Sequence, residues 1–208
     1  MYIPEAFAET EPTVLHELIR RFSFASLVTT ADGAPFASHL PLSLDIHDGP
    51  ERLLGHLARA NPHWQAFDGK TEAVAIFQGP HAYVSPNWYE SSNMVPTWNY
   101  AAVHAYGRPR IIDDTAQVIA TLDRLVGENE TTETGNWRLD RLDEKLVEGM
   151  LKGIVVFEMP IERLEGKFKM SQNRKPEDTK AAAAGLAATG DPVAAEVAKI
   201  MNARLIDR

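Results

Sequence analysis

The chain has 208 residues, which suffice for one large domain or for one domain with an extension, and no apolar run approaches the length that spans a bilayer. It contains no cysteine, so disulfides, thiolate metal sites and cysteine catalysis are excluded, and this absence fits a cytoplasmic protein. The formal net charge of −8 argues against a protein that binds nucleic acids mainly through contacts to phosphates.

The N-terminal half is predicted to be one helix followed by strands. The first residues, MYIPEAFAET, have neither the basic nor the apolar region of a signal peptide. A helix is predicted over residues 12–22, where Pro12 suits the first turn and apolar residues recur at helical spacing. Asp32-Gly33 is a hairpin-turn signal, and a second turn is predicted at 47–50. Strands are predicted at residues 25–31, 35–45, 52–58, 72–79 and 99–113, the last with a bulge at Gly107.

The C-terminal half adds helices and one long strand. Helices are predicted at about 114–127 and 140–151, a strand at 153–169, and then an alanine-rich helical tail that is split at Gly190. Because strands and helices do not alternate, a doubly wound sheet is excluded and a small antiparallel barrel flanked by helices is predicted, of the all-β or α+β class.

The stretch HLARANPHW, residues 56–64, carries one candidate anion site. Asn61 before Pro62 predicts the start of a short helix, whose first backbone N–H groups attract anions. Arg59 can fork onto a phosphate, and His56 can donate a hydrogen bond. Ordinary turn chemistry, with Asn61 only a cap and Arg59 solvated, explains the same residues, and the chemistry alone favours that interpretation.

Two further stretches have alternative interpretations. Residues 82–107 are rich in aromatic side chains on a predicted loop. Such side chains can form the wall of a site for a flat conjugated ligand, but the residues alone favour a place in a subunit interface or in the core. The stretch GKFKMSQNRK, residues 166–175, has Lys167 and Lys169 on one strand face and no acid. It is a second candidate anion site or a solvated edge whose lysines discourage edge pairing, and the edge is favoured.

No catalytic or metal motif is present. The histidines form neither an HxH nor an HExxH pair, no GxSxG sequence anchors a catalytic serine, and no pair of carboxylates stands out; the histidines are His16, His39, His47, His56, His63, His81 and His104. Catalytic residues therefore stay unassigned, and any enzyme activity would depend on a cofactor.

Six blocks of the sequence resemble one known family. MYIPEAF, TTADGAPFASHLPL, LLGHLARANPHW, FQGPHAYVSPNWY, VPTWNYAAVHAYG and LEGKFKMSQNR occur in the order found in the PaiB-type family of FMN-binding split barrels, which are related to the pyridoxine-phosphate oxidase fold. The resemblance covers roughly residues 1–175. It implies a six-stranded antiparallel split β-barrel flanked by helices, with residues 1–170 as the barrel domain, a helical insertion at about 114–152, and residues 171–208 as a helical extension packed on the same domain.

The resemblance also implies a cofactor and its contacts. Flavin mononucleotide (FMN) is expected in a groove at the interface of a homodimer, with its phosphate near His56, Ala58, Arg59, Ala60 and Asn61. The edge of the isoalloxazine ring is expected against Ser38, His39, Leu40 and Pro41. Trp98 and Asn99 are expected from the partner chain, and Lys167 and Gln172 are weaker candidates. The residues Asn93-Met94 depart from the family pattern, because a lysine is expected before Val95-Pro96.

The main hypothesis is a flavin-binding dimer that senses or transfers electrons, with flavin-dependent oxidoreductase activity as one possibility. Two alternative functions follow. The first is a transcriptional regulator that acts by binding DNA or a partner without flavin, since the family is named for negative transcriptional regulation. No helix-turn-helix or basic recognition helix is found in this sequence, so direct DNA binding is poorly supported and an indirect route through a bound cofactor or metabolite is favoured. The other alternative is a split barrel that binds haem through a histidine such as His39 or His104.

Overall fold

The computed structural model describes residues 1–31, 33–47 and 49–206. They form two compact units. The first comprises residues 1–18, 78–103 and 165–208, and the second comprises residues 19–77 and 104–164. Asp32 and Asp48, which belong to the two predicted turns, lie outside the described residues.

The strands form an antiparallel sheet, and three of them, β6, β7 and β9, have residues in both units. The path of the sheet runs in the order β3-β2-β6-β7-β9-β5-β4, and β8 pairs with β9 off this path. The pairs β2–β3, β2–β6, β4–β5, β5–β9 and β8–β9 are all antiparallel. The strands are β2 (Phe24–Ala31), β3 (Ala34–Pro41), β4 (Ser43–Asp45), β5 (Arg52–Ala58), β6 (Ala73–Val84), β7 (Thr97–Gly107), β8 (Arg110–Ile111) and β9 (Ile154–Lys169).

The sheet has nine strands within the described residues, and its path does not close, so the predicted count of six is wrong. The six predicted runs are all strands. However, the run 35–45 is interrupted after Pro41, where the backbone N–H of Leu42 donates a hydrogen bond to the carbonyl of Ser23. The run 99–113 is interrupted after Gly107, close to a proline that lacks the N–H for a ladder hydrogen bond. A short strand near the N-terminus, β1 (Ala8–Glu9), was not predicted.

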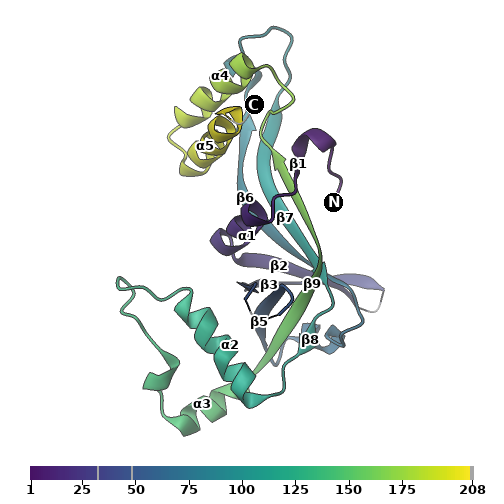
Figure 1. The fold of residues 1–208 in the computed structure, drawn as a ribbon, viewed down its shortest axis with the longest axis vertical. Coiled ribbons are helices and arrows are strands. Elements are labelled where there is room, and N and C mark those ends of the chain that lie inside the picture. The colour runs from purple at the N-terminus through teal and green to yellow at the C-terminus, as the bar shows by residue number, and fades with distance from the viewer. Residues whose placement is uncertain (32, 48, 207–208) are drawn as a thin grey trace. The chain divides into compact units, whose positions relative to one another are not determined.

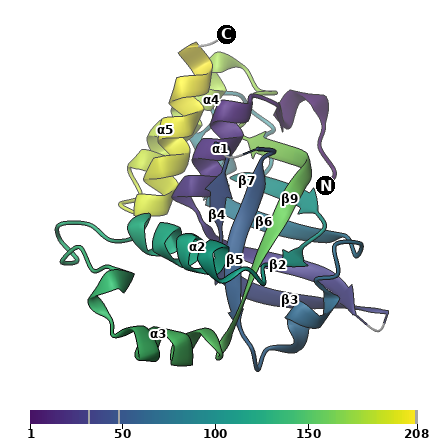
Figure 2. The same cartoon turned by 60° about the horizontal axis from the view of Figure 1, so that its bottom comes forward.

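The helix α2 (Thr115–Gly127) covers one face of β5 and β9, as Figure 2 shows. It begins at Asp114, whose side chain accepts a hydrogen bond from the backbone N–H of Gln117. Beneath it lies a cluster of apolar side chains from the strands and from α2: Leu54, Ile112, Val156, Val118, Leu122 and Ile154. The predicted helix 140–151 is in fact a 3₁₀ turn, η4 (Leu139–Arg141), and a separate helix, α3 (Glu144–Leu151), which Asp143 caps.

An ion-pair network fastens α2 to the sheet. Asp45 is 2% exposed and lies 2.8 Å from the guanidinium of Arg52 and 3.0 Å from that of Arg124. Burial acts to raise the pKa of Asp45, but the hydrogen bonds from the backbone of His47 and from Arg52, with the charge of Arg124, hold that pKa below its usual value. The carboxylate therefore stays ionised and links β4, β5 and α2.

The first unit contains the helical tail. The helices α4 (Pro176–Ala187) and α5 (Pro192–Ile206) pack side by side (Figure 1), and the break between them lies at Gly190, as predicted, which has φ +77°. The helix α1 (Pro12–Arg21) begins in this unit, and β1 pairs with β9, opposing Ala8 to Lys167. Among the residues that the structure describes, no helix is long and apolar enough to cross a membrane.

Candidate functional site

The predicted helix start after β5 is confirmed. Asn61 caps a short 3₁₀ helix, η2 (Pro62–Ala66), and its side-chain oxygen accepts a hydrogen bond from the backbone N–H of His63 at 3.0 Å. The proline occupies the first helical position, where its missing N–H costs nothing. The local sequence Asn-Pro therefore fixes how the chain leaves β5.

The same asparagine belongs to a buried polar network. Its Nδ2 donates to the hydroxyl of Ser38 at 2.9 Å, and that hydroxyl lies 2.8 Å from Nδ1 of His63. On the other side of the ring, Nε2 of His63 lies 2.9 Å from the hydroxyl of Thr29. Ser38, His63 and Thr29 are 7%, 2% and 2% exposed, so each of these groups depends on the others for its hydrogen bonds. The network locks η2 onto β2 and β3.

His63 is the central residue of this network, although the sequence analysis gave it no role. Its ring packs between Phe36, at a centroid distance of 4.8 Å, and Phe67, at 5.2 Å. Burial lowers the pKa of His63, so that the ring is neutral at pH 7. A local signal existed, because His63 follows the cap directly, but its partners lie on strands far away in the sequence.

Acid is expected to destabilise the protein through this ring. The pKa of His63 is lower in the folded chain than the unfolded value of about 6.5, so the unfolded chain binds the proton first. The contribution of the neutral His63 ring to the free energy of unfolding is fully present above the unfolded pKa, and it is lost as the pH falls toward the folded pKa. Urea unfolding of the wild type and of His63→Gln between pH 8 and pH 5 measures this, and an identical pH dependence in the two proteins would contradict it.

Arg59 makes structural hydrogen bonds and still faces a hollow. Its Nε donates to the carbonyl of Lys152 at 2.9 Å, and its Nη2 donates to that of Ile154 at 2.8 Å. Trp64 lies beside it, with the guanidinium 6.0 Å from the ring centroid and the indole N–H donating to the carbonyl of Arg59. The side chain is exposed, and further N–H groups of its guanidinium stay available to a ligand.

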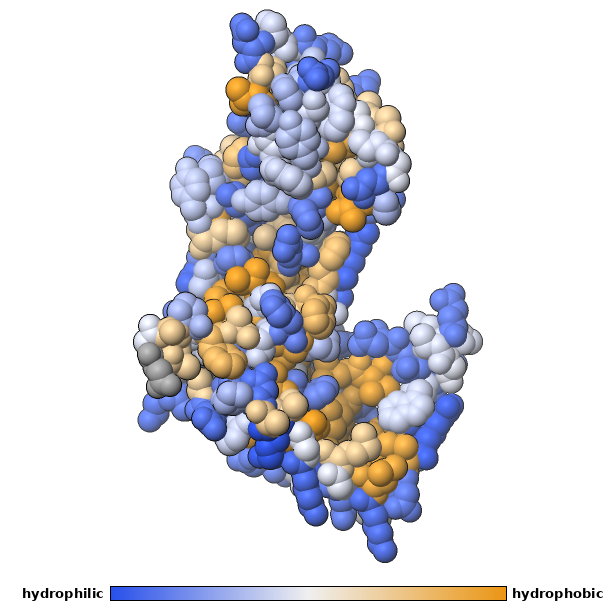
Figure 3. Space-filling model, turned by 180° about the vertical axis from the view of Figure 1, so that it is seen from behind, coloured by the Kyte–Doolittle hydropathy of each residue, from blue (hydrophilic) through white to orange (hydrophobic). Residues whose placement is uncertain are grey.

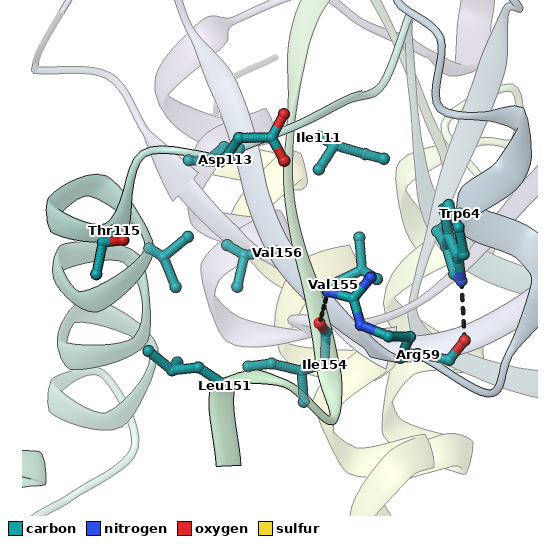
Figure 4. Close-up of a pocket in the computed structure, with 11 residues that line it drawn as sticks. Arg59, Trp64, Ile111, Asp113, Thr115, Leu151, Ile154, Val155 and Val156 are labelled. Atoms are coloured by element: carbon teal, nitrogen blue, oxygen red, sulfur yellow. Dashed lines mark hydrogen bonds between the residues drawn. The ribbon is translucent and has the colours of Figure 1, made fainter. Parts of the chain in front are cut away.

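The hollow at Arg59 has a volume of about 350 Å³. Figure 4 shows Arg59 and Asp113 at opposite ends of it, with apolar side chains of β9 between them. Apolar residues also gather around a hollow at the lower right of the space-filling view in Figure 3, over the segment that contains α2 and α3. The lining residues are Arg59, Trp64, Ile111, Ile112, Asp113, Thr115, Val118, Leu151, Ile154, Val155 and Val156. The volume of this hollow lies in the range of small-molecule sites, and its lining combines apolar side chains with a few polar ones.

The predicted ring contacts on β3 face alternate directions. Ser38 and Leu40 are buried, and the hydroxyl of Ser38 is already engaged in the polar network. His39 and Pro41 are exposed, and Nδ1 of His39 lies 2.9 Å from the hydroxyl of Ser26 on the neighbouring strand. Among the side chains of this group, only the exposed pair is open to a ligand.

His56 lies apart from these groups. It opposes Val156 in the β5–β9 ladder, and so shares a face of the sheet with the apolar cluster beneath α2. Burial lowers the pKa of His56, and its Nδ1 is buried without a hydrogen-bond partner among the described residues. A neutral ring in this position can offer a hydrogen bond to a phosphate but not a charge.

Trp98 and Asn99 lie on β7 in the first unit and face opposite ways. The indole of Trp98 is 55% exposed and lies near His81 and Tyr83, at centroid distances of 6.3 and 6.1 Å. Asn99 is fully buried and donates to the hydroxyl of Ser171 at 2.9 Å. The aromatic residues were predicted on a loop, but Tyr83 and Trp98 lie on strands, because β6 and β7 extend further than predicted, whereas Tyr100 lies within the predicted strand 99–113.

Lys167 and Gln172 also lie in the first unit. Lys167 is 8% exposed and donates to the carbonyl of Tyr2 at 3.0 Å, so the predicted solvated edge is wrong for this residue. The edge is covered, because β1 pairs there with β9. Gln172 closes the turn after β9, since its Oε1 accepts a hydrogen bond from the backbone N–H of Met170 at 2.6 Å and its Nε2 donates to the carbonyl of Phe168.

The two histidines considered as haem ligands differ in their surroundings. His39 is exposed on β3, whereas Nδ1 of His104 lies 3.4 Å from the hydroxyl of Tyr106. Within the described part of the chain, no group of three or more histidine, aspartate and glutamate side chains is placed to hold a metal ion. Haem binding stays a prediction.

Comparisons with known proteins agree on one family. Residues 1–163 match the family described as "Putative FMN-binding domain". The chain is 36% identical over 205 residues to protease synthase and sporulation protein PAI 2 of Bacillus subtilis, covering 99% of this chain and 98% of that protein. It is also 30% identical over 254 residues to an uncharacterized protein of Aspergillus fumigatus, covering 98% of this chain and 97% of the relative.

Solved structures share the fold. The FAD and heme binding protein from Mycobacterium smegmatis superposes with a TM-score of 0.61 at 18% identity, covering 78% of this chain and 73% of that one. The flavocytochrome Anf3 from Azotobacter vinelandii gives a TM-score of 0.59 at 18% identity, covering 78% and 69%. At this identity the likeness concerns the fold alone, and it supports the predicted antiparallel barrel flanked by helices.

Proposed function

Because this chain belongs to the FMN-binding domain family, we propose that it is a flavoprotein that binds FMN and that Arg59 holds the flavin phosphate. The role of Arg59 in holding the phosphate is supported by its position at one end of the hollow of about 350 Å³. Its two bonds to backbone carbonyls fix the guanidinium in place and leave donors for an anion.

The lining of the hollow fits the rest of such a ligand. Ile154, Val155 and Val156 offer an apolar wall on β9, which would exclude water from a flat ring. Asp113, at the far end from Arg59, can accept a hydrogen bond from an N–H group of a ligand, and its charge disfavours a negatively charged ligand group at that end. The arrangement therefore favours a ligand with an anionic tail at one end and a neutral ring beyond it.

The polar network serves the same purpose indirectly. Asn61 and His63 hold η2 against β2 and β3, and this fixes the loop that presents Arg59. His39 and Pro41, exposed on β3, remain candidates for contact with the ring. Trp98 and Asn99 remain candidates from the partner chain, and Lys167 and Gln172 remain weaker candidates. When bound, the flavin supplies the electron-transfer chemistry, while the protein supplies binding, orientation and electrostatics.

We further propose a cytoplasmic homodimer that completes the flavin site. The basis is the family resemblance, in which the partner chain contributes Trp98 and Asn99. The B. subtilis relative is named for protease synthesis and sporulation. If this chain has a regulatory role, the net charge of −8 favours a route through the bound flavin or a protein partner over direct DNA contact.

A titration with FMN tests the proposal. We expect a flavin absorption spectrum that stays with the protein through gel filtration. At about 100 times the dissociation constant, FMN should add about 2.7 kcal/mol of stability, which for a chain of this size is a rise of roughly 5–10 °C in Tm. Riboflavin, which lacks the phosphate, should give a smaller rise. No bound flavin and no shift would refute FMN binding, and a Soret band after addition of hemin would then favour the haem alternative.

A further inference from the structure

The first unit buries a lysine that forms no ion pair with an acid within the described part of the chain. The side chain of Lys167 is 8% exposed, and its ammonium lies 5.4 Å from the ring centroid of Tyr2 and 5.3 Å from that of Tyr100. Its one hydrogen bond goes to the carbonyl of Tyr2. Lysine is almost never fully buried unless it is paired with an acid, and an ammonium carries three N–H donors.

A second lysine lies on the same strand face. Lys169, two residues further along β9, donates to the carbonyl of Trp98 at 2.6 Å and to the hydroxyl of Thr97. Burial, and after it the charges of Lys167 and Arg174, lower the pKa of Lys169. Two ammonium groups are thus held close enough to repel each other, and their acceptors are neutral oxygens.

No ion pair to an acid is described for either lysine. Among the described residues, no aspartate or glutamate forms an ion pair with Lys167 or Lys169. The acids nearby are engaged elsewhere: Glu9 pairs with Arg204, and Glu165 pairs with the N-terminal amine. Burying positive charge costs free energy unless an opposite charge compensates it. An anionic ligand would supply that compensation.

We propose that Lys167 and Lys169 form an anion site that takes a phosphate group, carried either by FMN or by a second phosphorylated ligand. The two sources share the chemistry of a phosphate held by two ammonium groups. The site does not depend on Arg59, which lies in the other unit. If FMN is the source, Lys167 and Lys169 hold its phosphate in place of Arg59; if a second ligand is the source, the role proposed for Arg59 is unchanged. The site also does not require flavin, because the charge of the two lysines belongs to the chain itself.

Calorimetric titration with inorganic phosphate at constant ionic strength tests the site, on protein freed of flavin. We expect Lys167→Met and Lys169→Met each to weaken phosphate binding about tenfold or more, since each removes a charge-assisted hydrogen bond. The matched control is Lys199→Met, which removes a lysine of the same unit that is 77% exposed, and which should bind phosphate like the wild type. Absence of phosphate binding, or equal binding in all four proteins, would overturn the proposal.

Two further arms separate the outcomes. If Lys167→Met melts far below the wild type because it loses the contact to Tyr2, Lys169→Met alone decides, since the hydrogen bonds described for Lys169 go to Thr97 and Trp98. Repeating the titration on protein saturated with FMN or with riboflavin identifies the source. Loss of phosphate binding with FMN but not with riboflavin supports the site and assigns it to the flavin phosphate. Retained binding with FMN supports the site and assigns it to a second ligand. A protein that binds phosphate but no flavin would refute the proposed function and leave this site standing.

Discussion

An Arg59→Ala variant is expected to bind FMN about 10- to 150-fold more weakly than the wild type, because it loses charge-assisted hydrogen bonds to the phosphate worth about 1.5–3 kcal/mol. Riboflavin should bind both proteins equally, since it has no phosphate for Arg59 to hold. Fluorescence titration with each flavin measures the two affinities. Unchanged FMN affinity would remove Arg59 from the site.

The controls separate ligand contact from folding. Arg59 also bonds the carbonyls of Lys152 and Ile154, so the alanine variant must first be shown to melt as a folded protein without ligand. Arg59→Lys keeps the charge but loses the planar fork, and an intermediate affinity is expected. Arg138→Ala removes an exposed arginine of the same unit, whose side chain is 69% exposed, and should leave both affinities unchanged.

A Gly107→Ala variant is expected to lose about 3 kcal/mol of unfolding free energy. A Cβ atom at this position would lie 2.0 Å from the carbonyl oxygen of Pro160 and 3.0 Å from Cγ of Met159. The oxygen belongs to the backbone of β9, so it cannot move aside without disturbing the sheet. For a chain of this size, the loss corresponds to a drop in Tm of about 6–12 °C. Thermal and urea unfolding measure it.

Gly127→Ala is the matched control for this change. Gly127 ends α2, is exposed, and a Cβ there would meet nothing within 4 Å. Its replacement should be neutral or stabilise the protein by about 0.4–1 kcal/mol, because alanine restricts the unfolded chain. If Gly107→Ala melts together with Gly127→Ala, then β7 and β9 do not approach each other as closely as described.

Local sequence signals predicted most of the elements. The strand 52–58 coincides with β5, and the helix predicted at 114–127 begins one residue later, because Asp114 is its cap. These predictions succeed because a cap, a glycine or an alternating apolar run acts on its immediate neighbours. The strand count failed at Pro41 and Gly107, where the partners that continue or end a ladder lie far away in the sequence.

The sequence by itself determined most of the elements, the cap at Asn61 and, through six motif blocks, the family. It also named Arg59 and Lys167, but it could not say what surrounds them. Only the tertiary structure placed Arg59 at a hollow formed largely by residues 111–156, joined His63 to Ser38 and Thr29, and buried Lys167 where none of the described acids pairs with it. The reason is physical: burial, charge compensation and the sharing of hydrogen bonds are properties of side chains that meet across the sheet, and they depend on contacts between residues far apart in the chain.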